Sequence, residues 1–111
     1  MHQAADSIFS LIKVARLAFD RQVLAGAGAV SIDKTLTFCT NTTTQATTLA
    51  KGREGQLKII VQTVAGGTNT CTPVGGVSAG TTIAFASVGL VWFGIFAAGK
   101  WYTIYSTATV A

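Results

Sequence analysis

The chain carries little charge for its size. Of its 111 residues only 11% are charged, whereas a soluble domain usually has about 25%. Half of the residues are hydrophobic. A small domain has a large surface relative to its volume, so a lone soluble monomer would need more charge to cover it. We therefore expect a protein assembly or a membrane to cover part of this surface.

Side chains for catalysis and for metal binding are also scarce. His2 is the only histidine and lies at the terminus, and the four carboxylates are dispersed along the chain. Cys39 and Cys71 are the only cysteines, and they match no metal-binding spacing and have no credible histidine base. Acid–base and nucleophilic chemistry therefore have few candidates. We expect a non-enzyme without catalytic residues, cofactor or metal, and with two free thiols.

Dense positive charge is missing as well. The net charge is +4, and its eight basic residues are scattered along the chain. Proteins that bind nucleic acid usually show a denser basic patch with interleaved aromatic residues. We therefore expect no nucleic-acid partner.

One long stretch has no charge at all, between Ile59 and Gly99. Within it, Thr82–Gly99 approaches the lower length limit of a membrane-spanning helix. Its three glycines, its initial threonine and its many β-forming residues favour strands instead. We expect no membrane partner, and we keep a small holin-like membrane protein as the weakest alternative.

Short β-forming stretches recur about every ten residues after Arg21, separated by Gly, Thr and Asn. The expected strands are 21–24, 29–32, 35–40, 56–64, 70–74, 81–86, 90–96 and 101–105. Residues 41–48 are almost entirely polar, so we expect a loop or an exposed edge strand there. The sequence predicts an all-β domain over residues 21–111, a small antiparallel β-sandwich or barrel of about eight short strands.

The stretch 88–105 contains both tryptophans and both tyrosines. We expect a β-hairpin that turns at Ala97–Lys100, where Gly99 can take a positive φ. Trp101, Thr103 and Tyr105 would share one face of the second arm, and Tyr102 and Ile104 the other. Both faces carry large apolar groups, so one can cover the core and the other needs a partner. The expected oligomer-interface residues are Trp92, Phe93, Phe96, Trp101 and Tyr102.

Residues 1–20 have a different pattern, and we expect them to form a separate N-terminal helix or attachment arm. Residues 4–19 place apolar side chains at helical spacing, and Asp6 is a suitable N-cap. The alternatives are an extended arm across a neighbouring subunit and a helix packed on its own domain. We expect the segment to attach the protein to a partner through Ile8, Phe9, Leu11, Ile12, Lys13, Arg16 and Phe19.

Several short motifs together suggest a family. In order they are LAGAGAVS at 24–31, LAKGREGQ at 49–56, LKIIV, a Gly-Gly turn, TPV, GTTIAF and GKWYTI, with ATVA at the end. This set, over residues 21–111, resembles β-domains in virion proteins of tailed phages and marine viruses. It is most similar to the small capsid decoration, or cement, proteins of cyanophage-type heads. Two features depart from that pattern: Lys51 and Arg53 occupy a turn that is often more acidic, and VGLVWFGIF is more apolar than usual.

The resemblance implies a β-rich structural virion protein without an active site. Such a protein binds the outer surface of a phage head and stabilises contacts between capsomers. The implied partners are the major capsid protein and further copies of the chain, as a homotrimer or a dimer. The implied location is the capsid surface, after synthesis in the host cytoplasm. A phage fibre, tail or spike module is the principal alternative.

Overall fold

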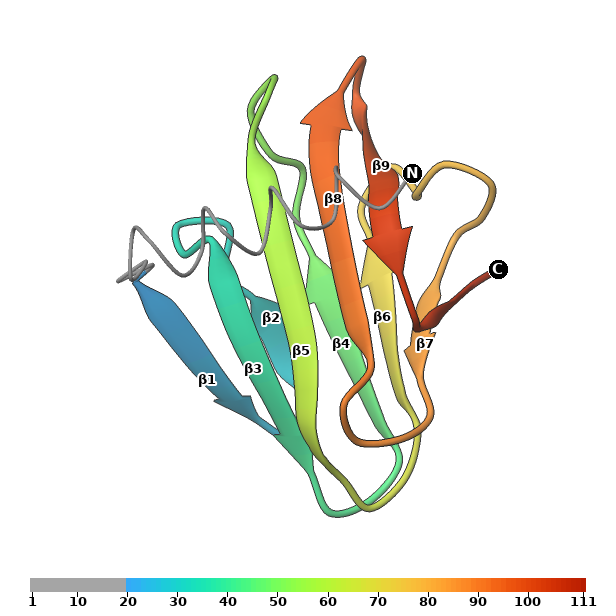
Figure 1. The fold of residues 1–111 in the computed structure, drawn as a ribbon. Helices are drawn as coiled ribbons and strands as arrows, with labels where there is room; N and C mark the ends of the chain where they lie inside the picture. The colour runs from blue at the N-terminus through green and yellow to red at the C-terminus, as the bar shows by residue number, and fades with distance from the viewer. Residues whose placement is uncertain (1–19) are drawn as a thin grey trace, which may run out of the picture.

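The protein folds as two five-stranded β-sheets packed face to face, as seen in a computed structural model that describes residues 20–111 (Figure 1). Sheet A has the order β1-β3-β5-β8-β9, and sheet B the order β10-β7-β6-β4-β2. The strands are β1 (Arg21–Ala25), β2 (Gly28–Val30), β3 (Leu36–Asn41), β4 (Gln45–Leu49), β5 (Leu57–Ala65), β6 (Asn69–Pro73), β7 (Ile83–Phe85), β8 (Val91–Ala97), β9 (Lys100–Ser106) and β10 (Thr109–Val110). The all-β sandwich expected from the sequence is confirmed, with ten strands in place of about eight.

The first six strands wind between the two sheets in three successive coils. In each coil the odd-numbered strand joins sheet A and the even-numbered strand joins sheet B. Because the chain returns to a sheet in the same direction each time, β1–β3, β3–β5, β2–β4 and β4–β6 are parallel pairs. The expectation of a purely antiparallel sandwich is wrong for this half. The short glycine- and threonine-rich connections between these strands lead across to the opposite sheet.

Strand β4 also differs from its expected role. Residues 41–48 were expected to form a loop or an exposed edge, yet Gln45–Leu49 pairs with strands on both sides, β2 and β6. The inward side chains of β4 are Thr47 and Leu49, both fully buried. Threonine is β-branched and suits a strand, so the polar composition of this stretch concealed an interior strand.

The last four strands close the sandwich with antiparallel pairs. β7 pairs with β6 and β10, and the hairpin β8–β9 completes sheet A beside β5. The hairpin turns at Ala98 and Gly99, whose φ values of 52° and 84° suit a two-residue type I′ turn. The backbone N–H of Ala98 donates a 2.8 Å hydrogen bond to the Glu54 carboxylate. The predicted hairpin and its positive-φ glycine are confirmed.

A β-bulge in the hairpin changes which side chains share a face. Phe93 pairs with Tyr105, but Gly94 pairs with Thr103, so Ile104 is the extra residue. Trp101 and Thr103 therefore point into the sandwich, whereas Tyr105 joins Phe93 on the outside. The expectation that Tyr105 shares a face with Trp101 is wrong, because the inserted residue shifts the alternation by one position.

Three aromatic residues fill the part of the core beneath this hairpin. Trp92, Phe96 and Trp101 are buried, and Trp101 meets the other two rings edge to face with centroids 5.9 Å and 5.2 Å apart. The indole N–H of Trp92 donates to Thr103 Oγ1 at 2.9 Å, and that of Trp101 donates to the Ala50 carbonyl at 3.0 Å. Both indoles are therefore held in one position.

We expect Gly94→Ala to lower the free energy of unfolding by about 2–3 kcal/mol, as over-packing of a closed core does. A Cβ at this position would lie 2.2 Å from the Trp92 ring and 2.8 Å from the Tyr102 carbonyl oxygen. Urea unfolding measures the loss. The comparison is Gly99→Asn, which changes a glycine with open space around it, and asparagine tolerates positive φ, so that loss should stay below about 1 kcal/mol. Equal losses for the two variants would contradict the described packing of Trp92.

Candidate functional site

The outer surface of sheet A is apolar across all five strands, and we call it the apolar face. Alternate residues of each strand point outward, and the strand registers align them in three rows across the sheet. The apolar face comprises, row by row, Leu36, Ile59, Phe93 and Tyr105; Val23, Phe38, Val61 and Val91; and Leu57, Ile95 and Tyr102.

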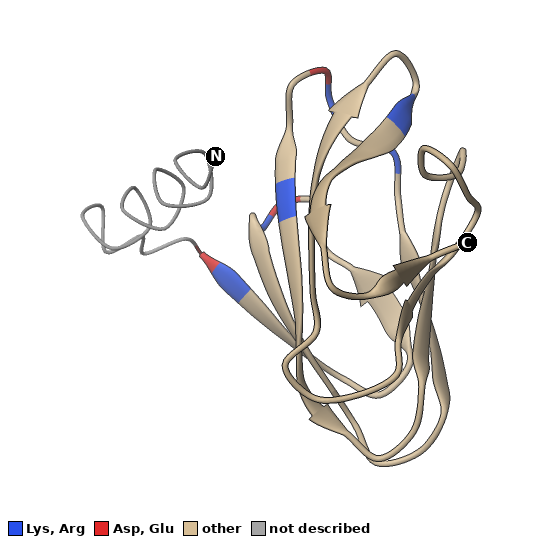
Figure 2. Ribbon diagram, turned by 45° about the vertical axis from the view of Figure 1, so that its right-hand side comes forward, with Lys and Arg blue, Asp and Glu red and all other residues tan. Residues whose placement is uncertain are grey.

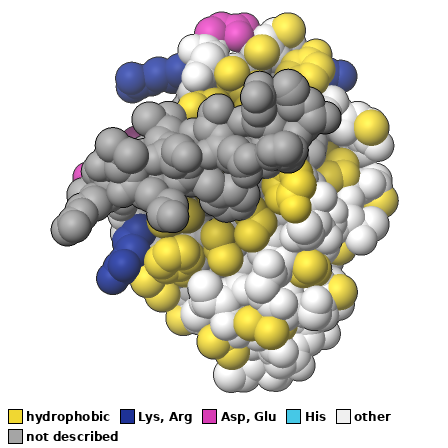
Figure 3. Space-filling view, viewed as in Figure 1, with side chains coloured by type: hydrophobic (Ala, Val, Ile, Leu, Met, Phe, Trp, Pro, Cys, Tyr) yellow, Lys and Arg dark blue, Asp and Glu magenta, His cyan; other side chains and the backbone are white. Residues whose placement is uncertain are grey.

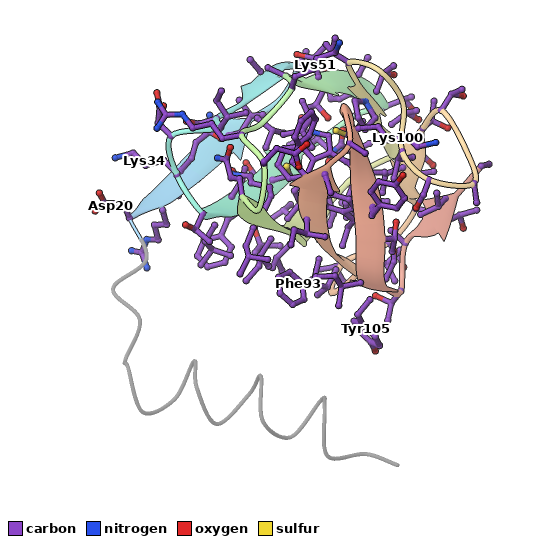
Figure 4. All side chains as sticks on the ribbon, turned by 90° about the horizontal axis from the view of Figure 1, so that it is seen from above. Asp20, Lys34, Lys51, Phe93, Lys100 and Tyr105 are labelled. Carbon is purple, nitrogen blue, oxygen red and sulfur yellow. The ribbon has the colours of Figure 1, made fainter. Side chains whose placement is uncertain are left out.

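No strand of the described part of the chain packs on the apolar face, because sheet B lies on the opposite side of sheet A. Val23 is 60% exposed, Tyr105 54% and Leu57 43%. Figure 3 looks onto this side of the molecule and shows hydrophobic side chains gathered on it. In Figure 4, Phe93 and Tyr105 point away from the sandwich on the same side. Sheets with parallel strands usually have both faces covered, so this surface is suited to a partner.

The outer surface of sheet B has a different chemistry. Its outward side chains are small, and none is charged. They are Ala29, Ala46, Thr48, Thr70, Thr72, Ala84 and Thr109. Threonine hydroxyls remain hydrated at such a surface, whereas the large aliphatic and aromatic groups of sheet A gain from leaving water. The two sides of the sandwich are therefore unequal, and sheet A carries the candidate docking surface.

Charged residues lie at the borders of the apolar face and not within it. The Arg21 guanidinium lies 5.8 Å from the centre of the Phe38 ring, and the Lys100 ammonium lies 5.6 Å from that of Tyr102. Both contacts are of the cation–π kind. Figure 2 shows the remaining charges mostly at the loops of one end, with none on the loops of the opposite end. A partner would thus meet an apolar centre with a few cations at its rim.

The interior, in contrast, contains a buried lysine. Lys58 is fully buried, and its ammonium donates to the carbonyls of Ser31 and Lys34, both at 2.6 Å, and to Thr37 Oγ1 at 2.7 Å. Thr37 in turn donates to Gln22 Oε1 at 2.9 Å. Burial lowers the pKa of Lys58 to about 8. Three acceptors match the three hydrogens of an ammonium, so this lysine joins β1, β3, β5 and the loop after β2.

A second polar group joins the two sheets at the other end of the coils. Thr47 donates to Asn69 Oδ1 at 3.0 Å, and Asn69 donates to Gln62 Oε1 at 3.1 Å. Gln62 donates to Asn41, which donates to the Gly67 carbonyl at 2.8 Å. Every buried side-chain nitrogen or oxygen in residues 20–111 has a partner. These four buried polar residues, with Lys58 and Thr37, hold the coils in register and are structural.

The two cysteines are buried free thiols, as expected. Burial raises the pKa of Cys39, and it raises that of Cys71 to about 12. Both thiols are therefore poor nucleophiles. Within the described residues, no group of three or more His, Cys, Asp or Glu side chains is placed to hold a metal ion.

The structure separates the residues expected at the oligomer interface into two groups. Phe93 and Tyr102 lie on the apolar face, whereas Trp92, Phe96 and Trp101 fill the core and are closed to any partner. The sequence did not indicate which side of the hairpin faces the core. In the structure, the indole hydrogen bonds hold Trp92 and Trp101 on the inner side. The expected attachment residues Ile8, Phe9, Leu11, Ile12, Lys13, Arg16 and Phe19 lie outside the described residues.

Most of the apolar face was not identified from the sequence. The alternation in residues 35–40 indicates that Leu36 and Phe38 share a side of their strand, as the structure confirms. The sequence did not indicate which side of their strand Leu57, Ile59 and Val61 occupy. The sequence signal for these three residues is their alternation with Lys58 and Gln62. By itself that alternation suggests that the polar side chains point to water. The structure has the reverse arrangement, since Lys58 and Gln62 are inside.

The uncharged stretch 82–99 contributes to both sheets. β7 lies in sheet B and β8 in sheet A, with a loop between them. Among residues 20–111 there is no helix with the length and hydrophobicity needed to cross a membrane.

Comparison with known proteins finds no matching family model and no matching curated protein. A function for this chain is therefore inferred from the chemistry of the apolar face.

We expect the free energy of unfolding to rise between pH 8 and pH 10.5 because of Lys58. Its pKa is lowered from 10.5 to about 8 in the folded protein, so in this window the unfolded chain binds more protons than the folded one. Below pH 8 the lysine is charged in both states and adds no slope. The increase in the free energy of unfolding has an upper limit of about 3 kcal/mol. The increase stays below this limit because a neutral amine has too few hydrogens for three acceptors.

The measurement is urea unfolding of the protein at pH 7.5 and at pH 10. Lys58→Met is the control, because it removes the titrating group while keeping an unbranched side chain. This variant should lose about 1–3 kcal/mol at pH 7.5, since the Ser31 and Lys34 carbonyls lose their donor, and should lack the rise with pH. The same pH dependence in both proteins would show that Lys58 does not titrate as described.

Proposed function

We propose that the protein is a structural, non-enzymatic component of a virus particle, a capsid decoration protein. In this role it binds the outer shell in many copies and stabilises contacts between capsomers. The observation that carries the proposal is the apolar face, a docking surface on a small sandwich whose interior is already closed. The virion setting comes from the resemblance of residues 21–111 to decoration proteins of phage heads.

The size of the apolar face supports a contact that is repeated many times. Five strands about 4.8 Å apart and three rows of side chains give roughly 400 Å². Exposed apolar patches of this size are often functional in monomeric proteins. A standard interface buries about 800 Å² on each partner, so this face supplies about half of one. Modest contacts suffice on a shell because many copies bind side by side, so avidity replaces the affinity of each contact.

The difference between the two outer surfaces suggests an orientation. Sheet A turns toward the shell and neighbouring copies, and the small uncharged surface of sheet B turns toward solvent. Tyr102, at the β9 margin of the apolar face, then lies where copies of the chain can meet in a homo-oligomer, for which the resemblance favours a trimer. Aromatic residues of this kind are enriched at interface centres.

The decisive test is whether the protein copurifies with intact virions in stoichiometric amounts. We expect a fixed ratio to the major capsid protein after density-gradient purification. Virions purified in this way without the protein would overturn the virion assignment.

Self-association should depend on the apolar face. We expect Tyr102→Asp to shift the protein from an oligomer toward a monomer at micromolar concentration, because a carboxylate at this margin of the apolar face must lose its water on assembly. Multi-angle light scattering gives the mass. Thr72→Asp is the matched control, with the same new charge on the outer surface of sheet B, and should leave the mass unchanged. If Thr72→Asp dissociates the oligomer and Tyr102→Asp does not, the orientation proposed here is wrong.

A further inference from the structure

We infer that residues 4–19 of the same chain lie across the apolar face as an amphipathic helix and cover its centre. The inference rests on the proposed function only in taking the apolar face as the docking surface. It goes further by naming what lies directly on that surface, a segment of this chain.

The described chain begins at the border of the apolar face. Asp20 directly precedes β1, which is an edge strand of sheet A, so residues 1–19 join the sandwich at the border of the apolar face. Figure 4 shows Asp20 at this edge. The next residue, Arg21, pairs with Leu36 and so stands at the end of the first row of the face. The segment therefore enters beside the surface that it is proposed to cover.

The second argument is length. A helix rises 1.5 Å per residue, so residues 4–19 span about 24 Å. Five strands spaced about 4.8 Å apart are about 19 Å wide. One helix of this length crosses the sheet once, from the β1 edge to β9.

The third argument is the pattern of the segment. Successive residues of a helix are separated by 100°, which places six apolar residues on one side and the charged residues on the other. The apolar stripe consists of Ile8, Leu11, Ile12, Ala15, Ala18 and Phe19. The opposite side carries Asp6, Lys13 and Arg16. An apolar stripe of this width needs an apolar surface to pack against. Among the described residues, the apolar face of sheet A has the right size.

The fourth argument concerns competition between the segment and other partners. No linker separates Phe19 from β1, apart from Asp20. A short connection gives the attached segment an effective concentration in the millimolar range at the face. A second copy at micromolar concentration therefore competes poorly, and same-chain docking is favoured over exchange between subunits.

Docking of this kind also explains the remaining residues of the segment. Phe9 and Leu17 fall on the charged side of the helix, next to Lys13 and Arg16. They would form a mixed apolar and basic surface directed away from the sandwich. That surface, with the uncovered margin of the apolar face, would meet the shell, and its basic part suits acidic groups there and is sensitive to salt.

Paramagnetic relaxation in the full-length protein tests the placement. A nitroxide at Ser10→Cys labels the segment, and the native cysteines stay unlabelled because both are buried with raised pKa values. We expect the amide signals of Ile59 and Phe93 to lose more than half of their intensity, and those of Thr48 and Thr72 to change little. Equal effects on both sheets, or none, would overturn the placement.

A mixed sample distinguishes the same chain from its neighbour. Nitroxide-labelled protein without isotope is mixed with isotope-enriched protein without nitroxide. We expect a much smaller loss at Phe93 in this mixture than in the single-chain sample. A loss as large as in the single-chain sample would overturn same-chain docking and assign the segment to a neighbouring copy.

Two substitutions give an independent readout. Ile12→Asp places a charge in the apolar stripe and should raise the fluorescence of a dye that binds exposed apolar surface several-fold. Ser10→Asp places the same charge outside the stripe and should leave it unchanged. No rise with Ile12→Asp would contradict the inference. Copurification with virions is measured on the unaltered protein, so its outcome judges the proposed function separately from this docking.

Discussion

The strands of sheet A carry large apolar side chains on both faces, and a two-layer sandwich can bury only one of them. The inner face packs against sheet B around Trp92, Phe96 and Trp101. The outer face keeps Phe93, Tyr105 and their neighbours beyond the sandwich. Because the hydrophobic effect grows with the apolar area exposed to water, this arrangement favours coverage of sheet A by something outside the described fold. The low charge of the chain is consistent with that requirement.

The interior is unusually polar where the three parallel coils stack. Lys58 joins strands at one end, and the series Thr47–Asn69–Gln62–Asn41 joins the sheets at the other. Satisfied polar groups of this kind are directional, whereas apolar contacts are not, so they favour one register of the coils over its alternatives. Apolar side chains of β5 that would ordinarily point inward occupy the outer surface instead. Polar and apolar side chains alternate along these strands, so the polar interior and the apolar face arise together.

The described residues offer a partner a surface and few reactive side chains. The buried thiols are protonated, the buried lysine donates to three acceptors, and the carboxylates among residues 20–111 lie in exposed loops. What remains available to a partner is a flat surface with cations at its rim. Repetition on a shell would allow such a surface to act with modest affinity at each contact. The docking that we infer for residues 4–19 would add a layer of this same chain to that arrangement.

The sequence by itself determined the β class, the start of the β-domain near Arg21 and the hairpin with its Gly99 turn, and it predicted that part of the surface is covered. These follow from local properties: β-forming residues, glycine at positive φ, and scarce charge. Only the tertiary structure decided the parallel coils, the interior position of β4, the burial of Lys58 and Gln62, and the outward side of Tyr105. The physical reason is that a strand with large side chains on both faces has no local preference for either. Long-range hydrogen bonds, together with one bulge at Ile104, choose the side that faces the core.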